Sequence, residues 1–267
     1  MKFEKVTPKD IDQIANLQPD GWSDIMTEFR FFLSANFCNP IKLIVDNEIV
    51  GVGCSVTFKN SAWLAHIIVG SEYRKRGFGS HIVEHLLNDL KNKPIESISL
   101  IASHFGEPVY KKFGFKTVSD YIYLERKEPW IDSEISERIV PFDSKFYSDI
   151  IRLDKDISGE EREPLLKRYI ESSFLYIENN ELKGFYIPTL GEGLLFADTT
   201  EAGIELMQMK YATVDTAVIP AGNQAALAFL EQNGFRESST KGKRMSIGKE
   251  IVWQPNKIFS RISGDYG

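Results

Sequence analysis

The sequence is short of cysteine, of long apolar runs and of excess positive charge. Cys38 and Cys54 are the two cysteines among 267 residues, so one disulfide is the most the chain could form. No window of about 18 uninterrupted apolar residues occurs, so no membrane-spanning helix is predicted. The first residues, MKFEKVTPKD, lack the apolar stretch of a secretory signal. We therefore expect a soluble protein of the reducing cytoplasm with no membrane partner.

The charge balance argues against a nucleic-acid partner. The formal net charge is -6 at pH 7, whereas a protein that binds a phosphate backbone normally carries a basic face. A local basic cradle for one small anionic ligand remains compatible with this balance. A cationic or neutral acceptor fits the composition better than nucleic acid does.

The length allows two ordinary domains, and apolar periodicity defines the elements of the first. Its predicted strands lie at residues 2–8, 42–46, 48–59, 62–69, 95–102 and 115–125, and its predicted helices at 8–17, 24–35, 80–90 and 107–113. Asp46 and Asn47 predict a tight turn between the second and third strands. We expect an α/β fold with a mixed, mostly antiparallel sheet flanked by helices.

The second part of the chain repeats this order of elements. Strands are predicted at 174–178, 182–189, 193–197 and 214–219, and helices at 201–211 and 224–233. At matching points the halves read YKKFGF (110–115) and LEQNGF (230–235), which we interpret as an internal duplication. Pro129 and Trp130 break the pattern, so we predict domains at 1–128 and 133–267.

Residues 67–80 are an apolar strand, a glycine-containing turn and the start of a helix. Main-chain N–H groups of such a turn, with the positive end of the helix dipole, can hold an anionic phosphate. The turn is neither a P-loop nor a G-x-G-x-x-G dinucleotide motif. A basic surface turn without a ligand gives a similar pattern.

The spacing Arg74, Gly77, Gly79 gives R-x-x-G-x-G, and this motif resembles the pyrophosphate loop of the GNAT superfamily of N-acetyltransferases. Tyr110, followed by Gly114-Phe115, matches a second motif of that family in the same order. The stretches 159–162 and 244–248 resemble the divergent second domain of a bacterial two-domain type. The resemblance implies tandem GNAT-like domains, the first catalytic and the second degenerate.

The resemblance also implies the ligand and its contacts. Acetyl-CoA would be the cosubstrate, and no metal is expected. The main chain of Ile67 and Val69 would pair with the pantetheine arm. The expected contacts of the pyrophosphate are Arg74, Lys75, Arg76, Gly77, Phe78, Gly79 and Ser80. Ser103 stands where many relatives carry an Asn that contacts pantetheine.

The expected reaction is direct attack of an amine on the thioester in a ternary complex. Tyr110 would protonate the departing thiolate, a general-acid contribution of about 10²- to 10⁴-fold. The Val69 N–H would stabilise the oxyanion, a contact worth roughly 10²- to 10³-fold. Cys54 lies in an apolar strand and is interpreted as a core residue, so no acetyl-enzyme is expected.

No single residue is predicted as the general base. His66 is interpreted as structural, because strict alternation along its strand puts it on the face opposite Ile67 and Val69. The alternatives left open are a water chain and His104, Glu28, Asp24 and Glu107.

The second half lacks the predicted catalytic groups. The turn corresponding to the cradle, 198–201, is acidic, and Leu230 replaces the tyrosine. We expect this half not to bind acetyl-CoA productively, but to line the acceptor pocket or to pack against a second subunit, so a homodimer stays open. The competing interpretations of the whole chain are a non-catalytic acetyl-CoA-binding sensor or scaffold and a nucleotide-dependent enzyme.

Overall fold

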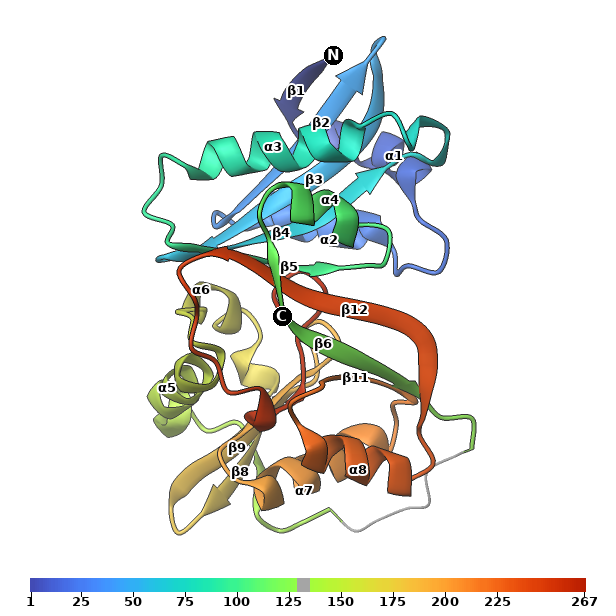
Figure 1. Cartoon of the computed structure of the whole chain (residues 1–267). Coiled ribbons are helices and arrows are strands. Elements are labelled where there is room, and N and C mark those ends of the chain that lie inside the picture. The colour runs from blue at the N-terminus through green and yellow to red at the C-terminus, as the bar shows by residue number, and fades with distance from the viewer. Residues whose placement is uncertain (129–134) are drawn as a thin grey trace. The chain divides into compact units, whose positions relative to one another are not determined.

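The computed structural model describes residues 1–128 and 135–267, so the predicted linker at 129–132 lies outside the described residues. The chain forms two compact units (Figure 1). The first comprises Met1–Lys116, Met245–Lys249 and Gly264–Tyr266, and the second comprises Thr117–Arg244, Glu250–Ser263 and Gly267. Each unit therefore contains segments that are distant in sequence. In the described residues, no helix is both long and apolar enough to cross a bilayer.

The first unit is built on a mixed sheet with the strand order β1-β2-β3-β4-β5, followed by the end of β12. The strands are β1 (Lys2–Lys5), β2 (Cys38–Val45), β3 (Glu48–Phe58), β4 (Ser61–Val69), β5 (Ser97–Ala102) and β12 (Arg236–Gly248). The helices are α1 (Ile11–Ile14), α2 (Ile25–Ser34), α3 (Phe78–Leu90) and α4 (Glu107–Lys112). Strands β1 to β4 are antiparallel neighbours, and β4 pairs with β5 in parallel.

Helix α3 packs closely on β3 because two strand positions carry no side chain. A Cβ at Gly51 would lie 2.9 Å from Cδ1 of Ile82, and one at Gly53 would lie 2.8 Å from Cγ2 of Ile82. The apolar stripe of α3 is buried as the sequence predicts. Helix α2 buries Ile25, Phe29 and Phe32, which recur at the i, i+4 and i+7 spacing of one helix face. These close contacts set the distance between α3 and β3.

A β-bulge interrupts β4 at His66. Cys54 pairs with Ala65 and Val52 with Ile68, so β4 has one residue more than β3 across this interval. His66 takes a left-handed conformation, with φ of 47°, which is uncommon for a residue with a Cβ. Leu64 and Ile67, three positions apart, pack in the same core cluster with α3. The strict alternation predicted for this strand is therefore wrong, because a bulge shifts the side-chain pattern by one residue.

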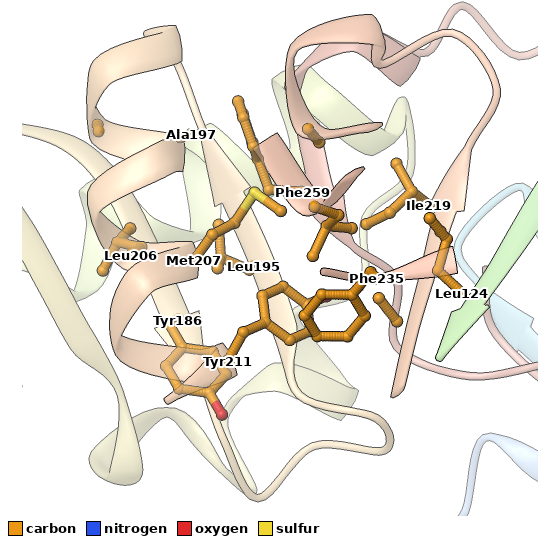
Figure 2. Packing of buried hydrophobic residues seen from close by; sticks show 14 of the residues in the cluster. Leu124, Tyr186, Leu195, Ala197, Leu206, Met207, Tyr211, Ile219, Phe235 and Phe259 are labelled. Atoms are coloured by element: carbon orange, nitrogen blue, oxygen red, sulfur yellow. The ribbon is translucent and has the colours of Figure 1, made fainter. Parts of the chain in front are cut away.

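The second unit contains a five-stranded sheet in the order β13-β10-β9-β8-β7 and the strands β12-β6-β11. Its strands are β6 (Lys116–Glu125), β7 (Ile139–Pro141), β8 (Phe174–Glu178), β9 (Glu181–Ile187), β10 (Leu194–Ala197), β11 (Thr216–Pro220) and β13 (Ile258–Ser260), besides β12. Its helices are α5 (Tyr147–Ser158), α6 (Glu163–Leu166), α7 (Thr200–Tyr211) and α8 (Gln224–Gln232). The core lies between α7, α8 and these strands. Figure 2 shows the ring of Phe235 beside Tyr211, at 5.3 Å between ring centroids.

The two halves of the chain repeat the same order of elements, as the predicted duplication requires. The order is β2, β3, β4, α3, β5, α4, β6 in the first series and β8, β9, β10, α7, β11, α8, β12 in the second. The two closing strands are exchanged, however. Strand β6 follows α4 but pairs with β11 in the second unit, whereas the end of β12 lies next to β5 in the first. Local periodicity predicts the strand at 115–125 but does not specify its partner.

Candidate active site

The open edge of β4 is the starting point of the site. Strands β4 and β5 pair through Ser61↔Ser97 to Trp63↔Ser99, where the paired register ends, although β4 continues to Val69. The amide of Gly70 donates to the carbonyl of Val50 at 3.0 Å. Since main-chain groups alternate in direction along a strand, the N–H of Val69 points away from β3. Among the described residues, no strand pairs with this part of β4 on the β5 side.

The turn after β4 gathers main-chain N–H groups. Lys75 and Gly77 both have left-handed φ values, of 63° and 84°, and such alternation of handedness makes a concave nest of amides. The amide of His81 donates to the carbonyl of Gly77 at 3.2 Å, as the first hydrogen bond of α3. Within the described chain, the amides of Phe78, Gly79 and Ser80 donate to no acceptor, as is usual in the first turn of a helix.

The surroundings of this nest are basic and sterically open. Arg74, Lys75 and Arg76 are all exposed, and Nε of Arg74 donates to the carbonyl of Val69 at 3.2 Å. Among the described residues, a Cβ at Gly79 would have one neighbour within 4 Å, Cγ2 of Val69 at 3.9 Å. Open amides, three cations and the dipole of a 13-residue helix together favour a bound polyphosphate.

Tyr110 lies in α4 and packs on the same core cluster as Ile67, Val69 and Phe78. The absence of a side chain at Gly106 makes room for its ring, because a Cβ there would lie 2.8 Å from Cε2 of the tyrosine. Burial raises the pKa of Tyr110 to about 12, so the phenol keeps its proton at neutral pH. The described residues offer its hydroxyl no hydrogen-bond partner. The structure thus brings the predicted residues of the first half together in one unit.

The pairing of His66 with Asp265 was not predicted from the sequence. Nδ1 of His66 lies 2.6 Å from Oδ1 of Asp265, and the side chains are 9% and 8% exposed. Burial lowers the pKa of His66, but the charge and hydrogen bond of Asp265 and the charge of Glu28 outweigh it, so the net pKa is raised. The partners are 199 positions apart in the sequence, and no local pattern connects them.

The corresponding edge in the second unit is filled by the chain itself. Strand β13 pairs with β10 through Leu195↔Ser260 and Phe196↔Ile258. In the first unit, the equivalent edge of β4 is unpaired beyond Trp63. At the start of α7, the amide of Ala202 donates to Oγ1 of Thr199 at 3.2 Å. Three ring atoms of Phe259 would lie within 2.4 Å of a Cβ at Gly203. Leu230, at the position matching Tyr110, is fully buried.

The mixed sheet of the first unit, with an open strand edge that leads into an amide nest at the start of a helix, is the fold of a GNAT-type acyltransferase. The family description "Acetyltransferase (GNAT) domain" matches the chain twice, at residues 34–126 and 150–260. The chain belongs to the GNAT acetyltransferases and carries two such domains in tandem.

Solved structures show the same fold over the whole chain. A proposed acetyltransferase from Pyrococcus horikoshii is 23% identical with a TM-score of 0.86, over 100% of this chain and 95% of that one. A GCN5-related N-acetyltransferase from Sphaerobacter thermophilus is 12% identical with a TM-score of 0.65, over 96% and 98%. A comparison with curated proteins finds no significant match. In the described residues, no cluster of three or more His, Cys, Asp or Glu side chains is arranged to hold a metal ion.

Proposed function

We propose that the protein is an acetyl-CoA-dependent N-acetyltransferase whose single active site lies in the first unit. The observation that carries this proposal is the open edge of β4, which ends in an amide nest with three basic side chains. An extended pantetheine arm would pair with the main chain of Ile67 and Val69, and the pyrophosphate would lie in the nest formed by residues 74–80. The acyl group would then reach the N–H of Val69, which would donate to the developing oxyanion.

Tyr110 would donate a proton to the departing thiolate. Its pKa of about 12 lies above the value of about 8.5 for an ordinary thiol, so full proton transfer from the isolated phenol is unfavourable by about 5 kcal/mol. The hydroxyl therefore first donates a hydrogen bond to the sulfur as negative charge develops there. Tyr110 then transfers its proton to the sulfur as the nitrogen of the collapsing tetrahedral intermediate gives a proton to Tyr110.

The second unit would not bind acetyl-CoA. Its strand β13 occupies the edge of β10 that would otherwise hold the pantetheine arm. The side chain of Thr199 satisfies one amide at the start of α7, and Glu201 places a carboxylate in its first turn. We therefore expect one coenzyme A per chain, measurable by isothermal titration calorimetry.

Replacing Tyr110 by Phe tests the enzymatic role. The variant removes one hydroxyl that has no protein partner within the described chain, so its fold should persist. We expect turnover to fall about 10²-fold or more, with the affinity for acetyl-CoA nearly unchanged by calorimetry. Unchanged turnover across the pH range would remove Tyr110 from the mechanism.

The main alternative is a sensor or scaffold that binds acetyl-CoA without turnover. Both interpretations predict thermal stabilisation by coenzyme A, whereas a nucleotide-dependent enzyme would be stabilised by ATP or NAD instead. Screening polyamines, aminoglycosides, amino acids and peptides for release of free coenzyme A separates the enzyme from the sensor. Release above the rate of hydrolysis with any acceptor supports the enzyme.

A further inference from the structure

We infer that Glu28, His66 and Asp265 form the acceptor side of this active site, where a cationic primary amine binds and gives its proton to His66. The inference deepens the proposed function and rests on it, because it names the acceptor class and the base of the same reaction. His66 touches the acceptor and is a catalytic residue. Asp265 acts through His66 and is a positioning residue.

The hydrogen bond to Asp265 sets the tautomer of His66. An ionised carboxylate only accepts hydrogen bonds, so Nδ1 of the imidazole must carry the proton that joins the two groups at 2.6 Å. In neutral His66 the lone pair is then on Nε2. The described residues provide no partner for Nε2, although the side chain is only 9% exposed. A buried imidazole is thus held with its basic nitrogen available to a ligand.

Glu28 supplies a second negative charge beside the imidazole. Its pKa is raised by burial and by the charge of Asp265, and His66 acts on it in the opposite direction. Glu28 forms no hydrogen bond or ion pair with any described residue, and no lysine or arginine is among the groups that perturb its pKa. The carboxylate of Glu28, which has no partner in the described chain, favours a cationic ligand on this side of the imidazole, and an alkylammonium is such a ligand.

Aromatic rings enclose the imidazole and provide an entrance. Phe29 and Phe32 contact it edge to face, at 5.9 and 5.5 Å between ring centroids. Trp22 does so at 5.8 Å and is 49% exposed, so it forms the solvent edge of the cluster. An indole at this position favours an approaching ammonium group through cation–π attraction.

The loop that carries Trp22 is fixed by Gln18. The side-chain amide of Gln18 donates to the carbonyls of Trp22 and Ser23, each at 3.1 Å. Its Oε1 accepts from the amide of Ile25 at 3.0 Å, at the start of α2. The entrance is therefore held by hydrogen bonds at both ends of this short loop.

The bulge gives His66 its place relative to the thioester. His66 precedes Val69 by three residues on β4, which corresponds to about 10 Å between their Cα atoms. It lies beyond Trp63, in the part of β4 whose edge is open. An alkylammonium at the imidazole can therefore direct its nitrogen toward an acyl group held at Val69.

The proposed step is balanced in atoms and charge. The ammonium gives one proton to Nε2 of His66, and the freed nitrogen lone pair forms the C–N bond while the C–S bond breaks. The second nitrogen proton replaces the one that Tyr110 gives to the thiolate. His66 then releases its proton to solvent, so the net products are the amide, coenzyme A and one proton.

The pH dependence follows from the groups that surround His66. These are Glu28 from α2, Asp265 and Tyr266 from the C-terminal segment, and the thiols of Cys38 and Cys54, which act on Asp265 or Tyr266. The carboxylates raise the pKa of His66 in the free protein and so favour the protonated imidazole. A bound ammonium would lower that pKa and restore the base. Activity should therefore rise with pH across the range around the lowered pKa of His66.

A direct test measures the imidazole by NMR in the full chain. The pKa of His66 is followed with n-butylamine as the probe, and with n-butanol as its neutral counterpart of similar size. We expect n-butylamine to lower the pKa and n-butanol to leave it unchanged. An unchanged His66 pKa, up to amine concentrations at which the circular dichroism spectrum begins to alter, would overturn the inference.

Three variants separate catalysis from structure. His66→Gln should lower kcat/KM for n-butylamine at neutral pH about 10²-fold or more, and the loss should shrink at alkaline pH, where free amine is abundant. Asp265→Asn should shift the acid limb of the pH–activity profile to lower pH, because the pKa of His66 falls when the imidazole loses this carboxylate. His85→Gln is the matched control, since His85 stacks on Phe3 and should leave activity unchanged.

The outcomes distinguish the two proposals. If coenzyme A does not bind the unmodified chain, the proposed function fails whatever His66 does. If coenzyme A binds with equal affinity to the unmodified chain and to His66→Gln, but the variant keeps full activity and an unaltered pH profile, the acceptor site fails and the proposed function stands.

Discussion

Replacing Gly203 by Ala tests whether the second unit is closed by its own chain. Gly203 lies in α7, over the ring of Phe259 from β13, and a Cβ there would lie 2.2 to 2.4 Å from three ring atoms. Contacts between carbon atoms are normally about 3.5 to 4.0 Å, so the ring would have to move by more than 1 Å. Phe259 is only 1% exposed, and its main chain belongs to a paired strand.

Two opposing effects determine the size of the change. Alanine in place of glycine favours a helix by about 1 kcal/mol, whereas overpacking a filled core costs typically 1–3 kcal/mol. The clash involves the ring of a buried aromatic residue rather than the end of a flexible chain, so we expect the upper part of that range. The net loss is about 1–2 kcal/mol, which lowers Tm by roughly 2–8 °C for a unit of this size.

Thermal unfolding followed by circular dichroism measures this change. The same substitution in a Phe259→Leu background is the matched control, because the smaller side chain leaves space for the methyl group and the helix gain should then dominate. The affinity for coenzyme A should not change in either variant, since the proposed site is in the first unit. A higher Tm for Gly203→Ala in the unmodified background would refute the account of β13 as a filled edge.

Two further predictions concern the cradle and a buried amine. Gly77→Ala should weaken coenzyme A binding and lower stability by about 1–2 kcal/mol, because φ is 84° there and alanine is strained in that region. In the described chain a Cβ at Gly77 would meet nothing within 4 Å, so the cause is strain rather than obstruction, and Gly77→Asn, which tolerates that conformation, should retain more affinity by calorimetry. Burial lowers the pKa of Lys210 to about 7, so between pH 7 and its ordinary value of 10.5 the unfolded chain holds a proton that the folded chain has lost. The free energy of unfolding should therefore rise with pH in that window, by up to about 1.4 kcal/mol per pH unit, and Lys210→Met should remove that slope in urea titrations.

Much of the fold was predictable because it depends on local patterns. The helix predicted at 24–35, the turn at Asp46-Asn47 and the helix after the glycine turn follow from apolar period and turn chemistry, and each is present. The strand, turn and helix at residues 61–90 were predictable for the same reason, since they are consecutive in the sequence, whereas the binding of pyrophosphate there stays a prediction. The predicted roles of Tyr110 and Val69 stay predictions, to be tested as described above.

The parts that sequence reasoning missed depend on contacts between distant segments. Alternation fails at His66 because one extra residue in β4 is accommodated only when its pairing with β3 is known. Asp265 carries no local sign of its partner 199 positions away. Strand β13 is three residues long, too short for periodicity to identify, yet it decides which of the two domains has an open edge.

The exchange of β6 and β12 has a practical consequence for anyone who divides this chain. A fragment ending at the predicted boundary, residue 128, would keep the cradle and Tyr110 but would lack residues 245–249 and 264–266, which belong to the same unit. Its β5 would lose the neighbouring strand, and its His66 would lose the carboxylate that fixes the imidazole. Such a fragment should expose an unpaired sheet edge and aggregate, so an inactive fragment would say nothing about the chemistry of the intact enzyme.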